Sequence, residues 1–410
     1  MIELNYPGKK SKDEILSLID RNRALPELDG NLLLFGDNLE TMGLLLEQFR
    51  NKIDLVYIDP PFNTSNSFHS GKDRVSTISS SKDDEIAYKD NLPKEEFIEF
   101  LRERLILLHE LLSPVGSLYL HIDYKIGHYV KIILDEIFGE DNFKNDIARI
   151  KSNPKNFQRR AYGNQKDLIL FYSKNKQSNI WNNITIPISE EELSKRFTKK
   201  TEDGRYYNTV PLHAPGESKG GATSGPWRGM MPPKGRHWRT SPEEFDRLDA
   251  QGLIEWSSTG NPRIIKFADQ HKGDKIQDVW VFKDPPYPIY PTEKNIDLLD
   301  QIVKQSSLPN SIVLDCFAGG GTTLKAAARN GRRWIGIDQS EVSIRTIKST
   351  INSDYTFVDI SKMIVEKVVV ETNSVEVPTN NTSKKRSSKK NHSSDTTDKP
   401  TKNRQLDDWQ

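Results

Sequence analysis

The sequence contains a strand that two consecutive prolines bring to an end. Residues 53–57 are rich in Ile, Leu, Val and Tyr, which favour a buried strand. Pro60 and Pro61 cannot donate to a sheet, so this strand must end at Asp59. The prolines fix the nearby carbonyl groups, and Phe62 adds a flat apolar face. A carboxylate, a fixed carbonyl and a ring suit the amino group of a planar heterocycle. An ordinary Asp-Pro-Pro turn is the alternative interpretation.

Strands and helices alternate on both sides of this segment. Residues 32–35 form an apolar run that ends at Gly-Asp-Asn, and the residues that follow show helical spacing up to Phe49. Similar patterns predict helices near 97–112 and 126–138 and strands at 117–122 and 168–172. Fully apolar strands separated by helices predict an α/β fold with a parallel sheet covered on both faces. The Ser-rich stretch from Phe62 to about Asn91 is expected to be either disordered or a mobile lid.

Composition limits the class of protein. With 29% charged and 35% hydrophobic residues among 410, the chain is typical of a soluble protein large enough for two domains. No apolar run approaches the ~18–20 residues of a membrane span and no signal peptide is evident, so we expect a cytoplasmic protein without a membrane partner. The single cysteine, Cys316, excludes an internal disulfide and zinc sites built on paired cysteines, and we expect no metal site.

Positive charge is concentrated in the middle of the chain, although the net charge is only +1. Between Lys144 and Lys275 there are about 24 Lys and Arg against 15 Asp and Glu. A further basic stretch follows Val377. This division is expected when only part of a protein follows a phosphate backbone, and a merely solvated charged face is the alternative.

The α/β pattern is lost between residues 175 and 288, where Gly, Pro, Arg and Trp accumulate. The stretches 226–229 and 232–239 combine basic, aromatic and turn residues, which favours an insertion that binds nucleic acid. A small structural subdomain is the alternative. The α/β pattern resumes with a helix from Asn295, a strand at 312–315 and another at 334–338. Beyond about Val377 the chain is polar and basic, which predicts a disordered tail.

A second candidate site is a glycine turn at residues 314–323, with the sequence Leu-Asp-Cys-Phe-Ala-Gly-Gly-Gly-Thr-Thr. The phosphate loop of ATP-hydrolysing proteins requires Gly-Lys-Ser/Thr, and no lysine follows Gly321. A dinucleotide fingerprint requires a third glycine where Leu324 stands. A cofactor with an adenosine and an amino-acid end remains, because Asp315 could pair with an ammonium group and Asp338, at the next strand end, suits ribose hydroxyls.

These motifs together resemble the amino-methyltransferases of DNA, in the β group whose catalytic motif precedes the cofactor motif. The resemblance covers about residues 32–351 and is close to the modification subunits of type III restriction systems. It implies a circularly permuted, Rossmann-like S-adenosylmethionine-dependent methyltransferase sheet with an inserted basic target-recognition region. It also implies catalysis by Asp59, Pro60, Pro61 and Phe62. The implied cofactor-binding residues are Asp37, Thr292, Lys294, Asp315, Phe317, Ala318, Gly319, Gly321, Thr322, Thr323 and Asp338.

The same resemblance implies methylation of adenine N6 in duplex DNA by base flipping, since Asp at position 59 goes mostly with adenine. Cytosine N4 methylation and a catalytically silent DNA-binding protein are the alternatives. A cognate restriction endonuclease and a homodimer are candidate partners, although this chain is shorter than typical type III subunits. Cys316 stands where proline is frequent. The candidate DNA contacts are Arg228, Lys234, Arg236, His237 and Arg239.

The predicted organisation has five parts. They are an N-terminal extension (1–30), the catalytic half of the methyltransferase domain (31–174), the target-recognition insertion (175–288), the cofactor-binding half (289–370) and the basic tail (371–410).

Overall fold

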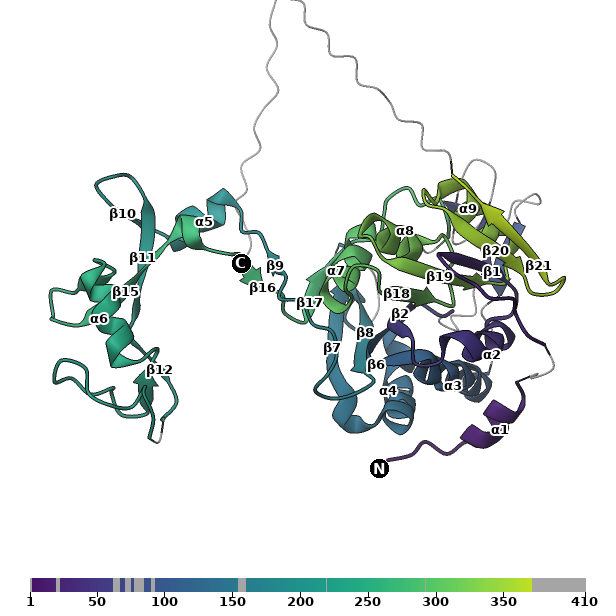
Figure 1. Cartoon of the computed structure of the whole chain (residues 1–410), viewed down its shortest axis with the longest axis horizontal. Helices are drawn as coiled ribbons and strands as arrows, with labels where there is room; N and C mark the ends of the chain where they lie inside the picture. Colours follow the sequence, from purple (N-terminus) through teal and green to yellow (C-terminus); the bar gives the residue numbers. More distant parts are fainter. Residues whose placement is uncertain are drawn as a thin grey trace, which may run out of the picture. The chain divides into compact units, whose positions relative to one another are not determined.

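The computed structural model describes residues 2–19, 23–61, 93–153, 160–218, 220–291 and 293–370, together with the backbone of three short strands within residues 67–89 (Figure 1). Phe62, Thr292 and the predicted tail, 371–410, lie outside the described residues. The roles assigned to them above therefore stay predictions.

A ten-stranded sheet organises the main body of the chain. Its order is β17-β7-β8-β6-β2-β18-β19-β1-β20-β21, and neighbouring strands are parallel except where β8 and β21 pair with their neighbours. The mostly parallel sheet confirms the predicted α/β class. The strands are β1 (Leu32–Phe35), β2 (Ile53–Ile58), β6 (Leu112–Ile122), β7 (Phe143–Ile150), β8 (Lys166–Ser173), β17 (Val279–Val281), β18 (Ile312–Asp315), β19 (Arg333–Asp338), β20 (Tyr355–Asp359) and β21 (Ile364–Val368).

Strands that are distant in the sequence lie side by side in this sheet. β18 pairs with β2, with Val313 opposite Leu55 and Leu314 opposite Val56, and β1 pairs with β19. The circularly permuted sheet that the family resemblance implied is thus confirmed. It brings the carboxyl ends of β2, β18 and β19 to one edge, where open α/β sheets bind ligands.

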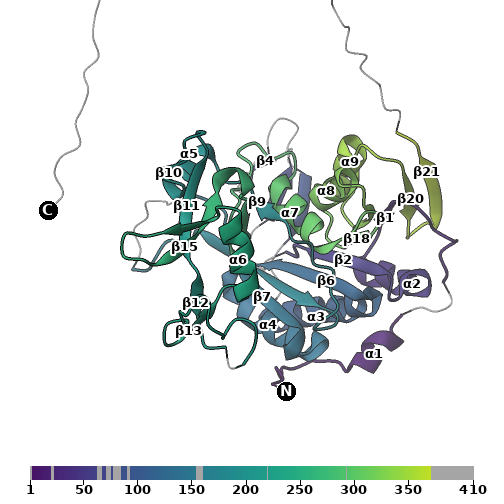
Figure 2. The same ribbon diagram turned by 60° about the vertical axis from the view of Figure 1, so that its left-hand side comes forward.

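Helices cover both faces of the sheet (Figures 1 and 2). Strand residues alternate between the faces, so Leu32 and Leu34 join one apolar cluster while Leu33 joins the other. The first cluster includes α2 (Asn38–Phe49), α3 (Lys94–Leu111) and α4 (Tyr124–Phe138), and the second includes α7 (Ile296–Ser306), α8 (Thr322–Arg329) and α9 (Glu341–Thr350).

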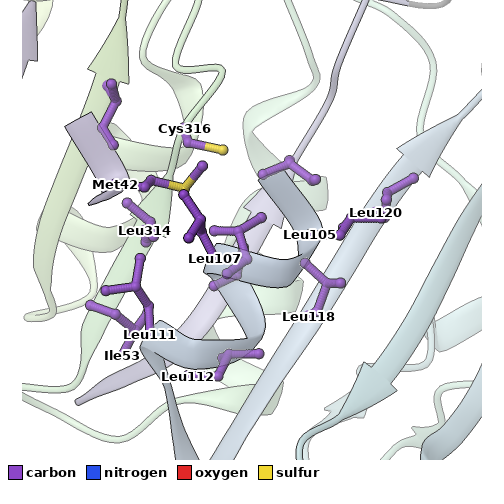
Figure 3. Packing of buried hydrophobic residues seen from close by; sticks show 14 of the residues in the cluster. Met42, Ile53, Leu105, Leu107, Leu111, Leu112, Leu118, Leu120, Leu314 and Cys316 are labelled. Carbon is purple, nitrogen blue, oxygen red and sulfur yellow. The ribbon is translucent and has the colours of Figure 1, made fainter. Parts of the chain in front are cut away.

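The first cluster also connects the two halves of the domain. Met42 of α2 and Leu107 of α3 pack with Leu314 and Cys316, which come from the cofactor half (Figure 3). All four side chains are fully buried. Burying one such aliphatic side chain stabilises a fold by roughly 1.5–3 kcal/mol. The shared core therefore fixes the two halves against each other, and Cys316 serves as a small apolar residue within it.

The N-terminal extension begins with α1 (Lys12–Ser17). Ser11 and Glu14 form a reciprocal capping box at its start. Upstream, the Tyr6 hydroxyl donates to Glu99 of α3 at 2.5 Å and Lys9 pairs with Glu136 of α4 at 2.8 Å. The extension is therefore attached to the helices of the main body.

The Ser-rich stretch contains three short strands. Within it, β3 (Ser67–Ser70) pairs antiparallel with β4 (Val75–Ser76) and β5 (Glu85–Lys89). Val75, Ile86 and Tyr88 supply the β-favouring residues that the polar composition concealed. Residues 62–66, 71–74, 77–84 and 90–92 lie outside the described part.

The predicted insertion contains a small fold with its own core. It has a four-stranded sheet, two short helices and two strand pairs, one of which, β9 with β16, joins its first and last segments. Its elements are β9 (Thr185–Ile186), α5 (Glu190–Arg196), β10 (Lys199–Lys200), β11 (Tyr206–Pro211), β12 (His213–Pro215), β13 (Arg236–Trp238), α6 (Pro242–Ala250), β14 (Ile254–Trp256), β15 (Pro262–Phe267) and β16 (Asp274–Lys275).

Two features of the insertion differ from the prediction. Trp227 and Trp238 are 2% and 3% exposed and pack around Phe245, so these aromatics form a core and are not available to stack on bases. In addition, β17 pairs with β7 in the main sheet, although it falls within the predicted range 175–288. Its three residues are too few to show a strand pattern in the sequence.

Candidate active site

One cavity joins the two sequence motifs. The residues Asp59, Asp315 and Asp338 follow or end β2, β18 and β19, and all three line it. The lining also includes Asn38, Tyr57, Pro60, Pro61, Phe100, Tyr290, Pro291, Glu293, Lys294, Leu299, Cys316, Phe317, Ala318, Gly319, Gly320, Thr322, Thr323, Gln339 and Ser340. Lys294 is the single basic side chain among these lining residues, against four acidic ones. The cavity therefore suits a ligand that carries positive charge.

Asp59 has one paired and one open oxygen. Its Oδ2 forms an ion pair with Lys294, which was predicted to bind the cofactor. Its Oδ1 is buried and accepts no hydrogen bond from any described residue. His121 Nδ1 lies 3.9 Å from this oxygen, beyond hydrogen-bond distance. The Oδ1 atom of Asp59 is thus a buried acceptor that is available for a hydrogen bond from a ligand.

The glycine turn after β18 has the shape that its sequence requires. Gly319 and Gly321 have φ values of +50° and +76°, which favour glycine. A Cβ at Gly320 would lie 2.8 Å from Tyr290 Cβ, so the turn packs closely on that ring. Gly321 precedes α8 and does not line the cavity, whereas Phe317, Ala318, Gly319, Thr322 and Thr323 do.

Two carboxylates hold this turn, namely the buried Asp315 at its start and the half-buried Asp338 at the end of β19. Asp315 accepts the Thr323 hydroxyl at 2.6 Å and the Phe317 N–H at 2.9 Å. Burial, and then the charges of Asp59 and Asp338, raise the pKa of Asp315 to about 7. Asp338 accepts the N–H groups of Gly319 and Ser340, each at 2.8 Å, and burial raises its pKa as well.

Asp37 does not line this cavity. It is the N-cap of α2, where its carboxylate accepts the N–H groups of Leu39 and Glu40 and pairs with Arg104 at 3.1 Å. The next residue, Asn38, lines the cavity instead and donates to the Cys316 carbonyl at 2.8 Å. Asp37 therefore supports the wall of the site through Arg104, which also bonds Asn38.

Several buried polar residues near Asp59 escape a reading of the sequence. The local pattern shows Tyr57 and His121 only as strand residues, yet the Tyr57 hydroxyl lies 2.9 Å from His121 Nδ1. His121 Nε2 lies 3.3 Å from Asp167 Oδ2. The signal available in the sequence was a polar residue, His121, inside an apolar strand. Its partners could not be identified, because Tyr57 and Asp167 are 64 and 46 residues away from it.

The predicted DNA contacts all lie in the insertion. Arg228 is paired with Asp249 at 2.8 Å and with Asp246 at 3.6 Å. Arg236 and Arg239 are exposed and near His213, and no described acidic side chain lies within ion-pair distance of either. His237 bonds the Gly216 carbonyl, and Lys234 is exposed on the same turn. The structure thus separates Arg228 from the other four.

Membrane spans and metal clusters are both absent from the described part of the chain. No helix there is long and apolar enough to cross a membrane. No group of three or more His, Cys, Asp or Glu side chains within the described ranges is placed to hold a metal ion.

A permuted α/β sheet whose carboxyl edge carries an acid-Pro-Pro rim and a glycine turn is an arrangement suited to an enzyme that binds a nucleoside cofactor. Comparison with known proteins gives the particular family. Residues 53–349 match the model of the N6/N4 DNA methylase family, described as DNA methylase. The chain is 38% identical over 361 residues to the Type II methyltransferase M.EcaI of Enterobacter cloacae, covering 84% of this chain and 76% of that one.

Two further relatives are more distant. The StyLTI Mod subunit, a Type III restriction-modification enzyme of Salmonella typhimurium, is 26% identical over 355 residues, which is 78% of this chain and 53% of that subunit. The solved M1.HpyAVI–SAM complex is 18% identical with a TM-score of 0.40, covering 78% of this chain and 100% of that one. This chain belongs to the DNA methylase family and is a DNA methyltransferase with S-adenosylmethionine as its methyl donor.

The described residues fit this cofactor. Its sulfonium and ammonium groups are cationic, and the cavity places Asp59, Asp315 and Asp338 around the glycine turn. Asp338 is fixed by two backbone N–H groups yet keeps lone pairs that can accept ribose hydroxyls. Lys294 is the cation among the lining residues that can pair with a carboxylate.

Proposed function

We propose that this enzyme methylates the N6 amino group of adenine at specific sites in duplex DNA, with the base rotated out of the helix into the cavity. The observation that carries this proposal is the buried, open Oδ1 of Asp59 in the same cavity as the glycine turn. An amino group offers two N–H donors, and Asp59 together with the Pro60 carbonyl supplies two acceptors on a rigid rim.

The chain's own residues would make a poor nucleophile reactive. The lone pair of an amino group on a purine is delocalised into the ring, so the nitrogen attacks slowly. Two acceptors that hold its hydrogens favour tetrahedral geometry and localise the lone pair. The bound cofactor supplies an electrophilic methyl group. The charge that develops on nitrogen is stabilised by Asp59, whose Oδ2 is held by Lys294. Pro60 and Pro61 keep the rim from moving.

Adenine is favoured over cytosine because Asp stands at the first position of the catalytic motif and because relatives include Type III Mod subunits. Cytosine N4 is the second candidate, since the matching family covers both amino groups. Nucleoside mass spectrometry of DNA from cells that express the enzyme separates them. N6-methyladenine supports the proposal, and N4-methylcytosine contradicts it.

Replacement of the catalytic acid tests the proposed role. We expect Asp59→Asn to lower methyl transfer at least ~10²-fold, because an amide is a weaker acceptor that donates where an N–H must point. Binding of S-adenosylmethionine, measured by calorimetry, should change little. Asp54→Asn is the matched control, because Asp54 lies on the same strand and accepts the Ser113 hydroxyl. Substantial transfer by Asp59→Asn would refute the role.

The remaining partners belong to the proposal as well. The insertion, with its exposed arginines, is proposed as the region that recognises duplex DNA, in a cytoplasmic enzyme. A cognate restriction endonuclease is proposed from the names of the relatives, but the chain spans only about half of the StyLTI subunit. A homodimer is proposed from the family resemblance. Co-purification and light scattering test these two partners.

A further inference from the structure

We propose that Tyr57, His121 and Asp167 form a positioning chain that keeps Asp59 Oδ1 free to accept the amino group of the target base. This inference rests on the proposed function. The three buried residues would act through Asp59 and not by binding the substrate themselves. The chain runs across β2, β6 and β8 at the edge of the sheet that holds the cavity.

The residues of this positioning chain are buried and lie within hydrogen-bond distance of one another. His121 and Tyr57 are 0% and 2% exposed, and Asp167 is 2% exposed. The Tyr57 hydroxyl lies 2.9 Å from His121 Nδ1, and His121 Nε2 lies 3.3 Å from Asp167 Oδ2. Both ring nitrogens of His121 therefore have a defined partner, one on each neighbouring strand.

The partners fix the position of the imidazole proton. A carboxylate only accepts, so Nε2 carries the proton that faces Asp167. Burial lowers the pKa of His121, so its ring is neutral near pH 7 and Nδ1 carries a lone pair. The Tyr57 hydroxyl donates to that lone pair. His121 consequently presents no N–H to Asp59, although its Nδ1 is only 3.9 Å from Oδ1.

The far end of the chain is anchored by cations. Asp167 accepts Lys151 at 2.6 Å and lies 3.6 Å from Arg149. Arg149 in turn donates to the Phe282 carbonyl at 2.9 Å and to Asp284 at 2.5 Å. Although burial opposes it, bonding to His121 and Lys151 lowers the pKa of Asp167, which keeps it a carboxylate. On the other side, the charged groups that face His121 are Asp59 and Lys294.

The consequence is a defined effect of losing the Tyr57 hydroxyl. Without that donor the neutral form of His121 is less favourable, so its pKa rises. A protonated Nδ1 beside Asp59 would then form an ion pair with Oδ1 and occupy the acceptor that the base needs. Catalysis would fall most at low pH, and the acid limb of the rate profile would move to higher pH.

The test compares Tyr57→Phe with Tyr119→Phe. Tyr119 is 1% exposed and loses a hydroxyl contact to Ser306 at 2.7 Å, so it controls for the loss of a buried tyrosine hydroxyl. We expect Tyr57→Phe to lower kcat about tenfold and to shift the acid limb upward, with the Kd for S-adenosylmethionine unchanged. Tyr119→Phe should move neither quantity. Equal behaviour of the two variants would overturn the inference.

A second comparison covers the histidine. The amide of His121→Gln can accept from Tyr57 and donate to Asp167, whereas His121→Leu can do neither. We expect the Gln variant to retain most of the activity that the Leu variant loses. Nitrogen chemical shifts of the imidazole, measured without cofactor, should show the proton on Nε2 in the wild type. A proton on Nδ1 would also overturn the inference. Inactive wild-type enzyme would instead contradict the proposed function.

Discussion

At the scale of single residues, Asp315 is a buried carboxyl group that lines the cavity. It lies 3% exposed between the Thr323 hydroxyl and the Phe317 N–H, and its pKa is raised to about 7 by burial and by two neighbouring carboxylates. Near neutral pH it is therefore partly protonated. An ammonium group from the cofactor would pair with its charged form only.

The affinity for S-adenosylmethionine should consequently depend on pH. Below about pH 7 each unit of acidification is expected to weaken binding by up to about tenfold, because Asp315 must lose its proton first. Above that pH the affinity should level off. For the protein without cofactor, the free energy of unfolding should depend on pH in the opposite direction. The folded pKa exceeds the unfolded value, so the free energy of unfolding falls as pH rises from about 4 to about 7. Calorimetric titration should show the first effect in the wild type and its loss in Asp315→Asn. A pH dependence that persists in the variant would contradict it.

At the scale of elements, the glycine turn between β18 and α8 positions the residues proposed to bind the cofactor. Gly321 combines a φ of +76° with a close approach to α9, because a Cβ there would lie 2.8 Å from Ile347 Cγ1. Gly331, which follows α8, has a φ of +71°, but a Cβ there would meet no atom within 4 Å. The two glycines thus share the backbone strain and differ in crowding.

Substitution by alanine at these two positions should separate the cost of backbone strain from the cost of crowding. Gly331→Ala is expected to lower the free energy of unfolding by about 1–2 kcal/mol, the cost of a left-handed conformation. Gly321→Ala should lower it further and also weaken cofactor binding, because the turn must move away from Ile347. Urea unfolding and calorimetry measure the two quantities. Equal losses in stability would show that crowding contributes nothing.

At the scale of the whole molecule, the basic side chains of the insertion differ in their partners. In the insertion, burial and then the charges of Arg236, Arg239 and Arg263 lower the pKa of His213. Arg228, in contrast, is neutralised by Asp246 and Asp249. Among the predicted DNA contacts, Arg228 is thus already in ion pairs, whereas the exposed Arg236 and Arg239 can bind phosphate.

Arg236→Ala and Arg228→Ala should differ in DNA binding. We expect Arg236→Ala to weaken duplex binding several-fold and to reduce the slope of log Kd against log salt by about one, as for one lost phosphate contact. Arg228→Ala should leave the slope unchanged. Binding at several salt concentrations provides the measurement. A change of slope in Arg228→Ala alone would reverse the assignment.

The sequence by itself determined where the main chemical groups stand. Prolines end β2 beside Asp59, glycines allow the turn after Asp315, and apolar runs define the strands, because each of these effects acts within a few residues. The pairing of β2 with β18 was predictable only through the family resemblance, since no local pattern joins segments so far apart. The local pattern also showed an excess of positive charge between Lys144 and Lys275.

Only the tertiary structure decided which groups meet. It placed Lys294 on Asp59, joined Tyr57 to His121 and Asp167, and buried Trp227 and Trp238 in a core of their own. These contacts connect residues far apart in the sequence, and their partners depend on the packing of whole elements. No local propensity encodes such a pairing, because burial and hydrogen bonding at each position are set by neighbours from other strands.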